Sequence, residues 1–219
     1  ILLNAINASQ KIVTIKSIIS QEITEQGKFS SYKGMYQAIS SGSFRIDYTY
    51  PERQVVVLHK NELLWFYPAI NVLYKIKKIG NIKLKPTFYS HLKVDGSPQH
   101  NITYLGRQFV GFLNFAYLFC IYNKKRNHTI YMWICKSRNV VLKKIIKNKK
   151  GIEIVKEIYS DFKIVKKIYI PHHVAVYTRT PHGVVMSKSH YKDTSINISI
   201  ANEIFHLDLP KNIVIKKFY

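Results

Sequence analysis

Hydrophobic and polar residues alternate along most of this chain, and a period of two is typical of β-strands with one buried face. In residues 44–50, for example, Phe44, Ile46 and Tyr48 fall on one side of a strand and the intervening polar residues on the other. The same alternation recurs in many short segments that are separated by turns rich in glycine and asparagine. The pattern therefore predicts a mainly β protein.

The elements expected from this pattern are a short helix over residues 1–10 and then a series of antiparallel strands. The strands are expected at residues 11–23, 32–40, 44–50, 54–58, 63–67, 72–79, 102–105, 111–122, 129–136, 140–148, 152–164, 168–178, 184–191 and 205–207. A turn over residues 24–31 separates the first two, and residues 81–99 are less regular, with a possible short helix at 83–93. A series of this length forms a strongly curled sheet or barrel, and a packed β-sandwich fits the alternation equally well.

A hairpin with its tip at residues 60–61 is the most clearly defined local unit. If Leu58 faces Leu63 across the hairpin, four apolar side chains share one side of it. These four are Val55, Val57, Leu64 and Phe66. We expect that side to face inward, together with Phe44, Ile46 and Tyr48, and we expect Trp65 and Tyr67 to face outward.

The length of the apolar runs bears on membrane insertion. No stretch reaches the roughly eighteen uninterrupted apolar residues of a transmembrane helix, and the longest run, near residues 109–122, is broken by Gly111 and Asn114. The chain begins with Ile1 rather than methionine, which a cleaved signal peptide and a shortened sequence would each explain.

The net charge of +22 is the most unusual feature of the composition. A basic surface attracts phosphate, whether in nucleic acid or in anionic lipid headgroups. However, lysine greatly outnumbers arginine and occurs with abundant isoleucine, asparagine and tyrosine, which indicates codon drift in a genome rich in A and T as the main cause. The lysines of residues 143–150 lack the aromatic signature of an RNA-binding strand, so nucleic acid is not the expected partner.

Residues suited to catalysis or metal binding are sparse. Two cysteines, Cys120 and Cys135, are too few for a disulfide scaffold. The expected hairpin would hold their sulfurs roughly 13 Å apart, so two free, buried thiols are predicted. His172 and His173 are neighbours in a strand and would point to opposite faces, which disfavours a shared metal ion. No nucleophile elbow, phosphate-binding loop or dinucleotide fingerprint is present. We therefore expect no cofactor, no metal and no enzymatic activity.

Several short motifs resemble, in order and spacing, those of the outer-membrane lipoprotein carrier family, LolA and its relatives. The motifs are IISQEI at residues 18–23, YKG at 32–34, FRIDY at 44–48, PE at 51–52, LLWFYP at 63–68, WICK at 133–136, YKD at 191–193 and FHLDLPKN at 205–212. The LLWFYP hairpin is the most specific of them, and the whole series spans most of the chain.

This resemblance implies that residues 1–219 form a single domain, an open antiparallel β-barrel of about ten or eleven strands with short helices covering an apolar cavity. The family's function is to carry acylated lipoproteins through the periplasm, from an inner-membrane ABC-type releasing complex to an outer-membrane acceptor. By this resemblance the seven inward residues named above would line the acyl-chain cavity of a periplasmic carrier with a signal peptide, and the protein would act as a monomer.

The sequence differs from the family in two places, and several alternative functions are compatible with it. The family's arginine before a proline, which helps to hold its lid shut, is replaced by Ser40, so that latch is absent or lies elsewhere. Residues 80–100 also lack the family's usual helical pattern. The alternatives are another lipid-binding barrel, such as a LolB-like outer-membrane acceptor, a glycolipid carrier or an envelope-stress sensor, and a basic nucleic-acid-binding protein.

Overall fold

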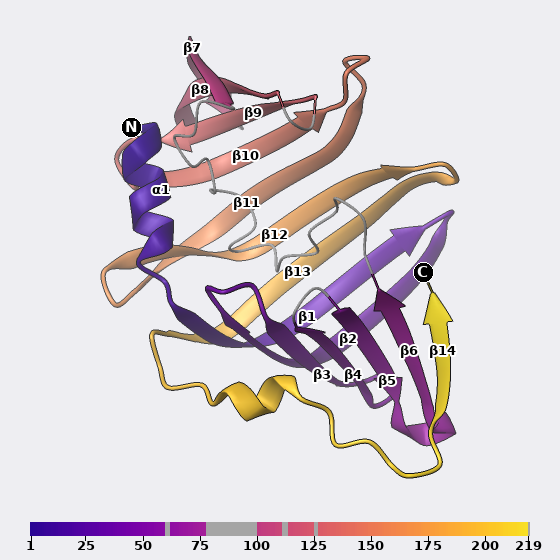
Figure 1. Ribbon diagram of the computed structural model, residues 1–219. Helices are drawn as coiled ribbons and strands as arrows, with labels where there is room; N and C mark the ends of the chain where they lie inside the picture. The colour runs from indigo at the N-terminus through magenta and orange to yellow at the C-terminus, as the bar shows by residue number, and fades with distance from the viewer. Residues whose placement is uncertain (60–61, 78–99, 111–113, 125–126, 219) are drawn as a thin grey trace. The chain divides into compact units, whose positions relative to one another are not determined.

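The computed structural model describes residues 1–59, 62–77, 100–110, 114–124 and 127–218 and has a mainly β fold, as the alternation predicts (Figure 1). It begins with one short α-helix, α1 (Leu2–Gln10). The strands of the first half are β1 (Thr14–Glu25), β2 (Lys28–Ile39), β3 (Phe44–Tyr50), β4 (Gln54–His59), β5 (Glu62–Tyr67), β6 (Val72–Lys77) and β7 (His100–Val110). Those of the second half are β8 (Asn114–Asn123), β9 (His128–Cys135), β10 (Val140–Lys147), β11 (Glu153–Val165), β12 (Ile168–Thr180), β13 (Gly183–Ile196) and β14 (Val214–Phe218). Two 3-10 turns, η1 (Pro68–Ile70) and η2 (Asn202–Phe205), complete the described elements.

All fourteen strands belong to one sheet, in the order β14-β6-β5-β4-β3-β2-β1-β13-β12-β11-β10-β9-β8-β7. The order ends at β14 and β7, so the sheet of the described residues is open rather than closed on itself. Most neighbours are antiparallel, but β14 runs parallel to β6, which makes the sheet mixed (Figure 1). The expected open, mainly antiparallel architecture is therefore confirmed, with more strands than the ten or eleven that the family resemblance implies.

The first turn is tighter than expected. Instead of a loop over residues 24–31, β1 continues to Glu25 and β2 starts at Lys28. Gln26 and Gly27 connect them, and both have positive φ angles, of 49° and 75°. A two-residue turn with two positive φ angles matches the twist of an antiparallel pair, so the strands can extend up to the turn itself.

The C-terminal segment also differs from the expectation. Residues 205–207 were predicted as a terminal strand, but η2 ends at Phe205 and the terminal strand is β14, further along the chain. The backbone N–H of Val214 donates to the carbonyl of Asn71, which starts the pairing of β14 with β6. The hairpin tip at residues 60–61, the irregular stretch 81–99 and Gly111 lie outside the described residues.

Contacts divide the chain into two compact units. Unit 1 contains Ile1–Lys11, Glu22–Ser30 and Leu92–His190, and unit 2 contains Ile12–Gln21, Ser31–His91 and Tyr191–Tyr219. Each unit has its own apolar cluster of buried residues. In unit 1 the cluster is Ala116, Leu118, Trp133, Cys135, Val140 and Leu142, and in unit 2 it is Val55, Val57, Phe66, Leu73 and Phe205. Among the described residues, no helix is long and apolar enough to cross a membrane.

Candidate functional site

The predicted residues of β3 lie on one face of the unit 2 sheet, here called the Phe44 face. Phe44 and Tyr48 are buried and Ile46 is half-buried between them. The register pairs Ile46 with Val56 of β4, which in turn pairs with Trp65 of β5. Directly paired residues in antiparallel strands point to the same side, so Trp65 shares the Phe44 face.

The four predicted residues of the hairpin lie on the opposite face. Leu58 does pair with Leu63, as expected, and this places Val55, Val57, Leu64 and Phe66 together. However, Val57 pairs with Arg45 and Val55 with Asp47, not with the apolar residues of β3. The seven predicted residues are thus divided between two faces of the sheet and do not line one common cavity.

The face that carries Val55 and Val57 is filled by the chain's own C-terminal segment. Residues 197–213, here called the strap, contribute Phe205, which is 1% exposed, to the cluster on this face. The other strap side chains that pack there are Ile200, Ile204, Leu207 and Ile213. This strap face is therefore a packed core and not a ligand cavity.

Arg45 fastens the strap to the sheet. Its Nε and Nη2 atoms donate to the two carboxylate oxygens of Asp47, each at 2.7 Å, and its Nη1 atom donates to the carbonyl of Ile204 at 2.8 Å. The hydrogen bond to Asp47 raises the pKa of Arg45 above its usual range. Arg45 and Asp47 thus form a bidentate ion pair, and the remaining guanidinium donor, Nη1, binds the backbone of the strap.

The Phe44 face is aromatic. The Tyr48 hydroxyl donates to Gln21 Oε1 at 2.7 Å, and its ring centre lies 5.3 Å from that of Tyr32. Trp65 Nε1 donates to Gln54 Oε1 at 3.0 Å, and the Trp65 ring stacks on Tyr67. Burial raises the pKa of Tyr48, and the same cause raises that of Tyr67 to about 12. The shifts reflect the removal of the Tyr48 and Tyr67 phenols from water on this face.

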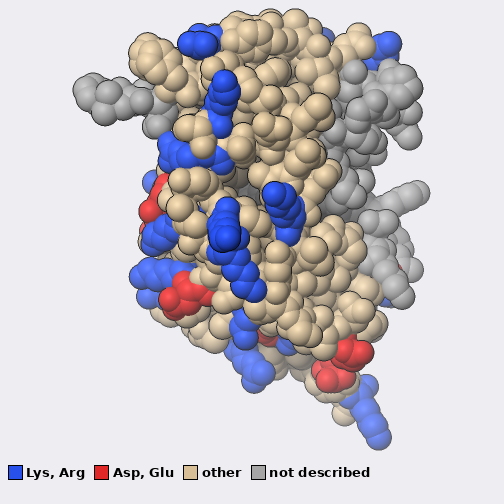
Figure 2. Space-filling model, turned by 90° about the vertical axis from the view of Figure 1, so that its left-hand side faces the viewer, with Lys and Arg blue, Asp and Glu red and all other residues tan. Residues whose placement is uncertain are grey.

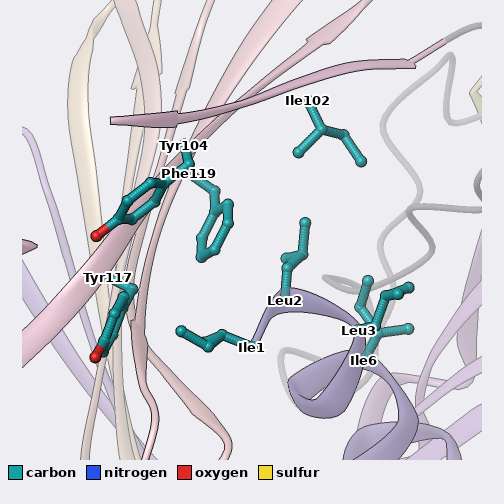
Figure 3. A pocket seen from close by; sticks show the side chains of 8 residues that line it. All are labelled: Ile1, Leu2, Leu3, Ile6, Ile102, Tyr104, Tyr117 and Phe119. Atoms are coloured by element: carbon teal, nitrogen blue, oxygen red, sulfur yellow. The ribbon is translucent and has the colours of Figure 1, made fainter. Parts of the chain in front are cut away.

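Unit 1 contains an apolar pocket that the sequence analysis did not anticipate (Figure 3). Its volume is about 470 Å³, and its lining comes from one end of α1 and from two strands, β7 and β8. The lining residues are Ile1, Leu2, Leu3, Ile6, Ile102, Tyr104, Tyr117 and Phe119. Pockets for small ligands commonly measure about 300–1,000 Å³ and are largely apolar, so this pocket has the size and lining of a site for an apolar small molecule.

The strand side of the pocket is an aromatic wall. The ring of Tyr104 lies 5.4 Å from that of Phe119 and 6.1 Å from that of Tyr117, measured between ring centres. Figure 3 shows the hydroxyl groups of Tyr104 and Tyr117 pointing away from α1, so the rings present carbon to the cavity. Arg107, with its guanidinium 5.3 Å from the Tyr117 ring centre, adds a positive charge beside this wall.

The helix side of the pocket depends on how α1 is packed. Leu2, Ala5 and Ile6 are buried, whereas Leu3 is 68% exposed although it lines the pocket. Leu2 and Ile6 are four residues apart and therefore lie on one side of the helix. The predicted helix over residues 1–10 is confirmed. The sequence indicated β7 and β8 only through the alternation of Ile102 with Tyr104 and of Tyr117 with Phe119.

A buried ion pair lies on the same face of the unit 1 sheet as the pocket. Phe119 pairs with Met132, Met132 with Lys144, and Lys144 with Glu157, so the four share this pocket face. Lys144 Nζ lies 3.1 Å from a Glu157 carboxylate oxygen, with both side chains 6% exposed, and the Tyr159 hydroxyl donates to the same carboxylate. Burial lowers the pKa of Lys144. The pocket face is thus apolar with one charged pair embedded in it.

The histidines of β12 lie on its two opposite faces, as their adjacent positions predict. His173 pairs with His190 and contacts Ser160, while His172 is buried on the opposite face of β12. No group of three or more metal-binding side chains occurs among the described residues. Cys120 and Cys135 are both free, as predicted, but only Cys135 is buried, whereas Cys120 is half-buried and pairs with Tyr131.

Comparison with known proteins identifies the fold. No protein-family model and no curated protein matches the sequence. Among solved structures, a DUF1329 family protein from Desulfovibrio piger matches with a TM-score of 0.70 at 13% identity, covering 94% of this chain and 95% of the other. A putative outer membrane lipoprotein-sorting protein domain from Vibrio parahaemolyticus has a TM-score of 0.67 at 11% identity, covering 93% and 95%. A LolA superfamily protein from Nitrosomonas europaea has a TM-score of 0.65 at 12% identity, covering 94% and 98%. The chain therefore shares the LolA-like fold over almost its whole length.

Proposed function

We propose that this protein is a periplasmic lipid carrier that shelters the acyl chains of lipoproteins in the unit 1 pocket. The observation that supports this most directly is the apolar cavity of about 470 Å³ between α1 and the β7–β8 hairpin. Each methylene removed from water contributes roughly 0.8 kcal/mol. An apolar pocket of this size can therefore offset part of the cost of moving an acyl chain out of a bilayer.

The fold adds weight to the proposal. Two of the similar structures are a lipoprotein-sorting protein domain and a LolA superfamily protein, and both are covered almost completely by this chain. We accordingly propose that residues 1–219 are one LolA-like domain without enzymatic activity. Its partners would be acylated lipoproteins, an inner-membrane releasing complex and, where present, an outer-membrane acceptor.

The Phe44 face of unit 2 is proposed as a second apolar surface for the ligand. Phe44, Ile46 and Tyr48 remain candidates because the strap packs on the other side of β3. Val55, Val57, Leu64 and Phe66 are left out of the proposed site because the chain itself covers them. A half-buried residue is the best place to test this surface, because a charge at a fully buried one would unfold the protein.

A fluorescent fatty acid is the simplest probe of the pocket. Phe119→Glu places a carboxylate in the pocket wall and should weaken binding of the probe at least about tenfold, because an unpaired charge is costly in an apolar site. The matched control is Ile164→Glu, at a strand position of unit 1 that is 62% exposed and does not line the pocket. If Phe119→Glu binds the probe as well as Ile164→Glu does, the pocket is not the lipid site.

The Phe44 face is tested in the same way by Ile46→Glu, with Thr49→Glu on the exposed end of the same strand as control. Lipoprotein specificity requires a further comparison, between an acylated lipoprotein and the same protein without its acyl groups. Binding of free fatty acid but not of the acylated protein would indicate a different lipid-binding role, such as a glycolipid carrier.

A further inference from the structure

A β-bulge interrupts β7 beside the wall of the unit 1 pocket. Tyr104 pairs with Phe119 and Arg107 pairs with Tyr117, so three residue steps along β7 lie opposite two along β8. Gly106, within the bulge, has a φ of 100°, a backbone conformation that residues with a side chain rarely adopt. Bulges of this kind redirect side chains and are common next to functional sites.

The bulge brings Arg107 to the pocket face of the sheet. Strict alternation would place Arg107, three positions after Tyr104, on the opposite face. The extra residue reverses this, because Arg107 pairs directly with Tyr117 and directly paired residues point to the same side. Tyr117 lines the pocket, and the Arg107 guanidinium lies 5.3 Å from the centre of its ring. This distance is within the range of cation–π attraction, so a positive charge is held beside the pocket wall.

The charge of Arg107 is not neutralised by a carboxylate in the part of the chain that the structure describes. None of the ion pairs among the described residues involves Arg107, and neither β7 nor β8 contains an aspartate or a glutamate. The residue is exposed, so a ligand can reach it. Lys144, on the same face, is by contrast buried and paired with Glu157. Arg107 is therefore a cation of the pocket face that is open to an anionic ligand.

We propose that Arg107 is a headgroup site and that the pocket therefore also accepts free acidic lipids, whose acyl chain ends in a carboxylate or a phosphate. The inference rests on the proposed function, because it takes the apolar pocket as the site of the acyl chain. Tyr117 joins the two parts, since it lines the pocket and lies beside the guanidinium. A guanidinium can donate two parallel hydrogen bonds to a carboxylate or phosphate. The acyl chain leaves water in the pocket while the charged group stays at the exposed arginine.

Net charge is the main alternative explanation for any preference for anionic lipids. Basic groups exceed acidic ones by 34 to 12 in the whole chain, and they also predominate on the side of the molecule drawn in Figure 2. A control variant at Arg179 separates Arg107 from this background. Arg179 is likewise an exposed arginine of unit 1, but it belongs to β12 and does not line the pocket. R107Q and R179Q thus remove the same charge from the same unit.

Isothermal titration calorimetry with three lipids that share a myristoyl chain tests the proposal. Myristate and myristoyl lysophosphatidic acid are anionic, whereas monomyristin is neutral. The wild type should bind each anionic lipid about fivefold more tightly than monomyristin, as expected for an exposed ion pair. R107Q should lose this preference and bind monomyristin as the wild type does, which also shows that the variant is folded. R179Q should keep the preference, and added salt should reduce it in the wild type.

The outcomes separate this inference from the proposed carrier function. Equal binding of myristate, lysophosphatidic acid and monomyristin by the wild type would overturn the headgroup site and leave the carrier function intact. Equal loss of the preference in R107Q and R179Q would also overturn it, since the attraction would then follow net charge. If none of the three lipids bound to the wild type, the pocket would hold no acyl chain and both proposals would fall. Where the preference is found, the tighter anionic lipid shows whether a fatty acid or a phospholipid is its source.

Discussion

Each unit has an apolar sheet face next to a segment from one end of the chain, and the two arrangements differ. In unit 2 the C-terminal strap places Phe205 on Val55 and Val57 and fills the available space. In unit 1 the N-terminal helix α1 lies beside β7 and β8 and leaves a cavity of about 470 Å³ lined by Ile6 and Phe119, among others. Alternating apolar residues are present in both cases. The segment that covers them determines whether they form a core or a binding site.

The largest expected effect is a difference in stability between two variants, one with a phenylalanine of the strap face truncated to alanine and one with a phenylalanine of the pocket wall truncated. Phe205→Ala should lower the free energy of unfolding by about 3–5 kcal/mol, because it opens a cavity in a filled core. Phe119→Ala should cost only about 1 kcal/mol, because this half-buried ring already borders an open space. Urea unfolding of both variants measures the difference. Equal losses would mean that the pocket wall is packed as tightly as the strap face.

The buried ion pair provides the next comparison. Lys144→Met removes the ammonium that lies 3.1 Å from Glu157 and should destabilise the protein by about 3 kcal/mol, since the carboxylate remains buried. The low end of the usual range applies because Tyr159 still donates to that carboxylate. The double variant Lys144→Met/Glu157→Gln should recover part of the loss in urea unfolding. If the double variant were less stable than Lys144→Met, the charge pair would not be the cause.

The register of the hairpin shows how far sequence reasoning reaches. The pairing of Leu58 with Leu63 was predicted, because a short tip fixes the register of its two strands. The pairing of Arg45 with Val57 was not, because it depends on residues 51–53 between β3 and β4. A change of one residue in such a connection turns every side chain of the strand to the other face. The predicted grouping of all seven residues on one face is wrong because the connection between β3 and β4 places Val55 and Val57 opposite Asp47 and Arg45.

The pocket and the strap could not be predicted for a different reason. Ile6 and Phe119 come from elements more than one hundred residues apart, and alternation within β8 carries no information about the segment that will cover it. The strap is similar, since Phe205 and Val57 meet through a segment without regular alternation. Local patterns identified the strands, the mainly β class and the free cysteines, whereas non-local packing determined the site.

The hydrogen bonds of Arg45 test how the strap is held. Arg45→Met removes the hydrogen-bond donor to the Ile204 carbonyl and the ion-pair partner of Asp47. Because the Arg45 side chain is partly exposed, the free energy of unfolding should fall by only about 1–2 kcal/mol. The strap should also become more sensitive to limited proteolysis. Arg179→Met is the control, because Arg179 is exposed and its hydrogen bond among the described residues is a 3.2 Å contact from Nε to the carbonyl of Glu153. Similar cleavage of the two variants would show that Arg45 does not fasten the strap.

The smallest expected effect concerns the face opposite the strap and appears only at alkaline pH. Burial raises the pKa of Tyr67 from 10.0 to about 12, so the folded protein keeps a proton that the unfolded chain loses between these values. The stability contributed by this group is fully present below about pH 10 and is lost as the pH rises toward about 12. Tyr67→Phe should therefore flatten the decrease in unfolding free energy between about pH 10 and 12, with the unfolding free energy of the variant at pH 7 as the baseline. If the slope were unchanged, the phenol would be as accessible to water in the folded protein as in the unfolded chain, and the Phe44 face would be less shielded than the strap face.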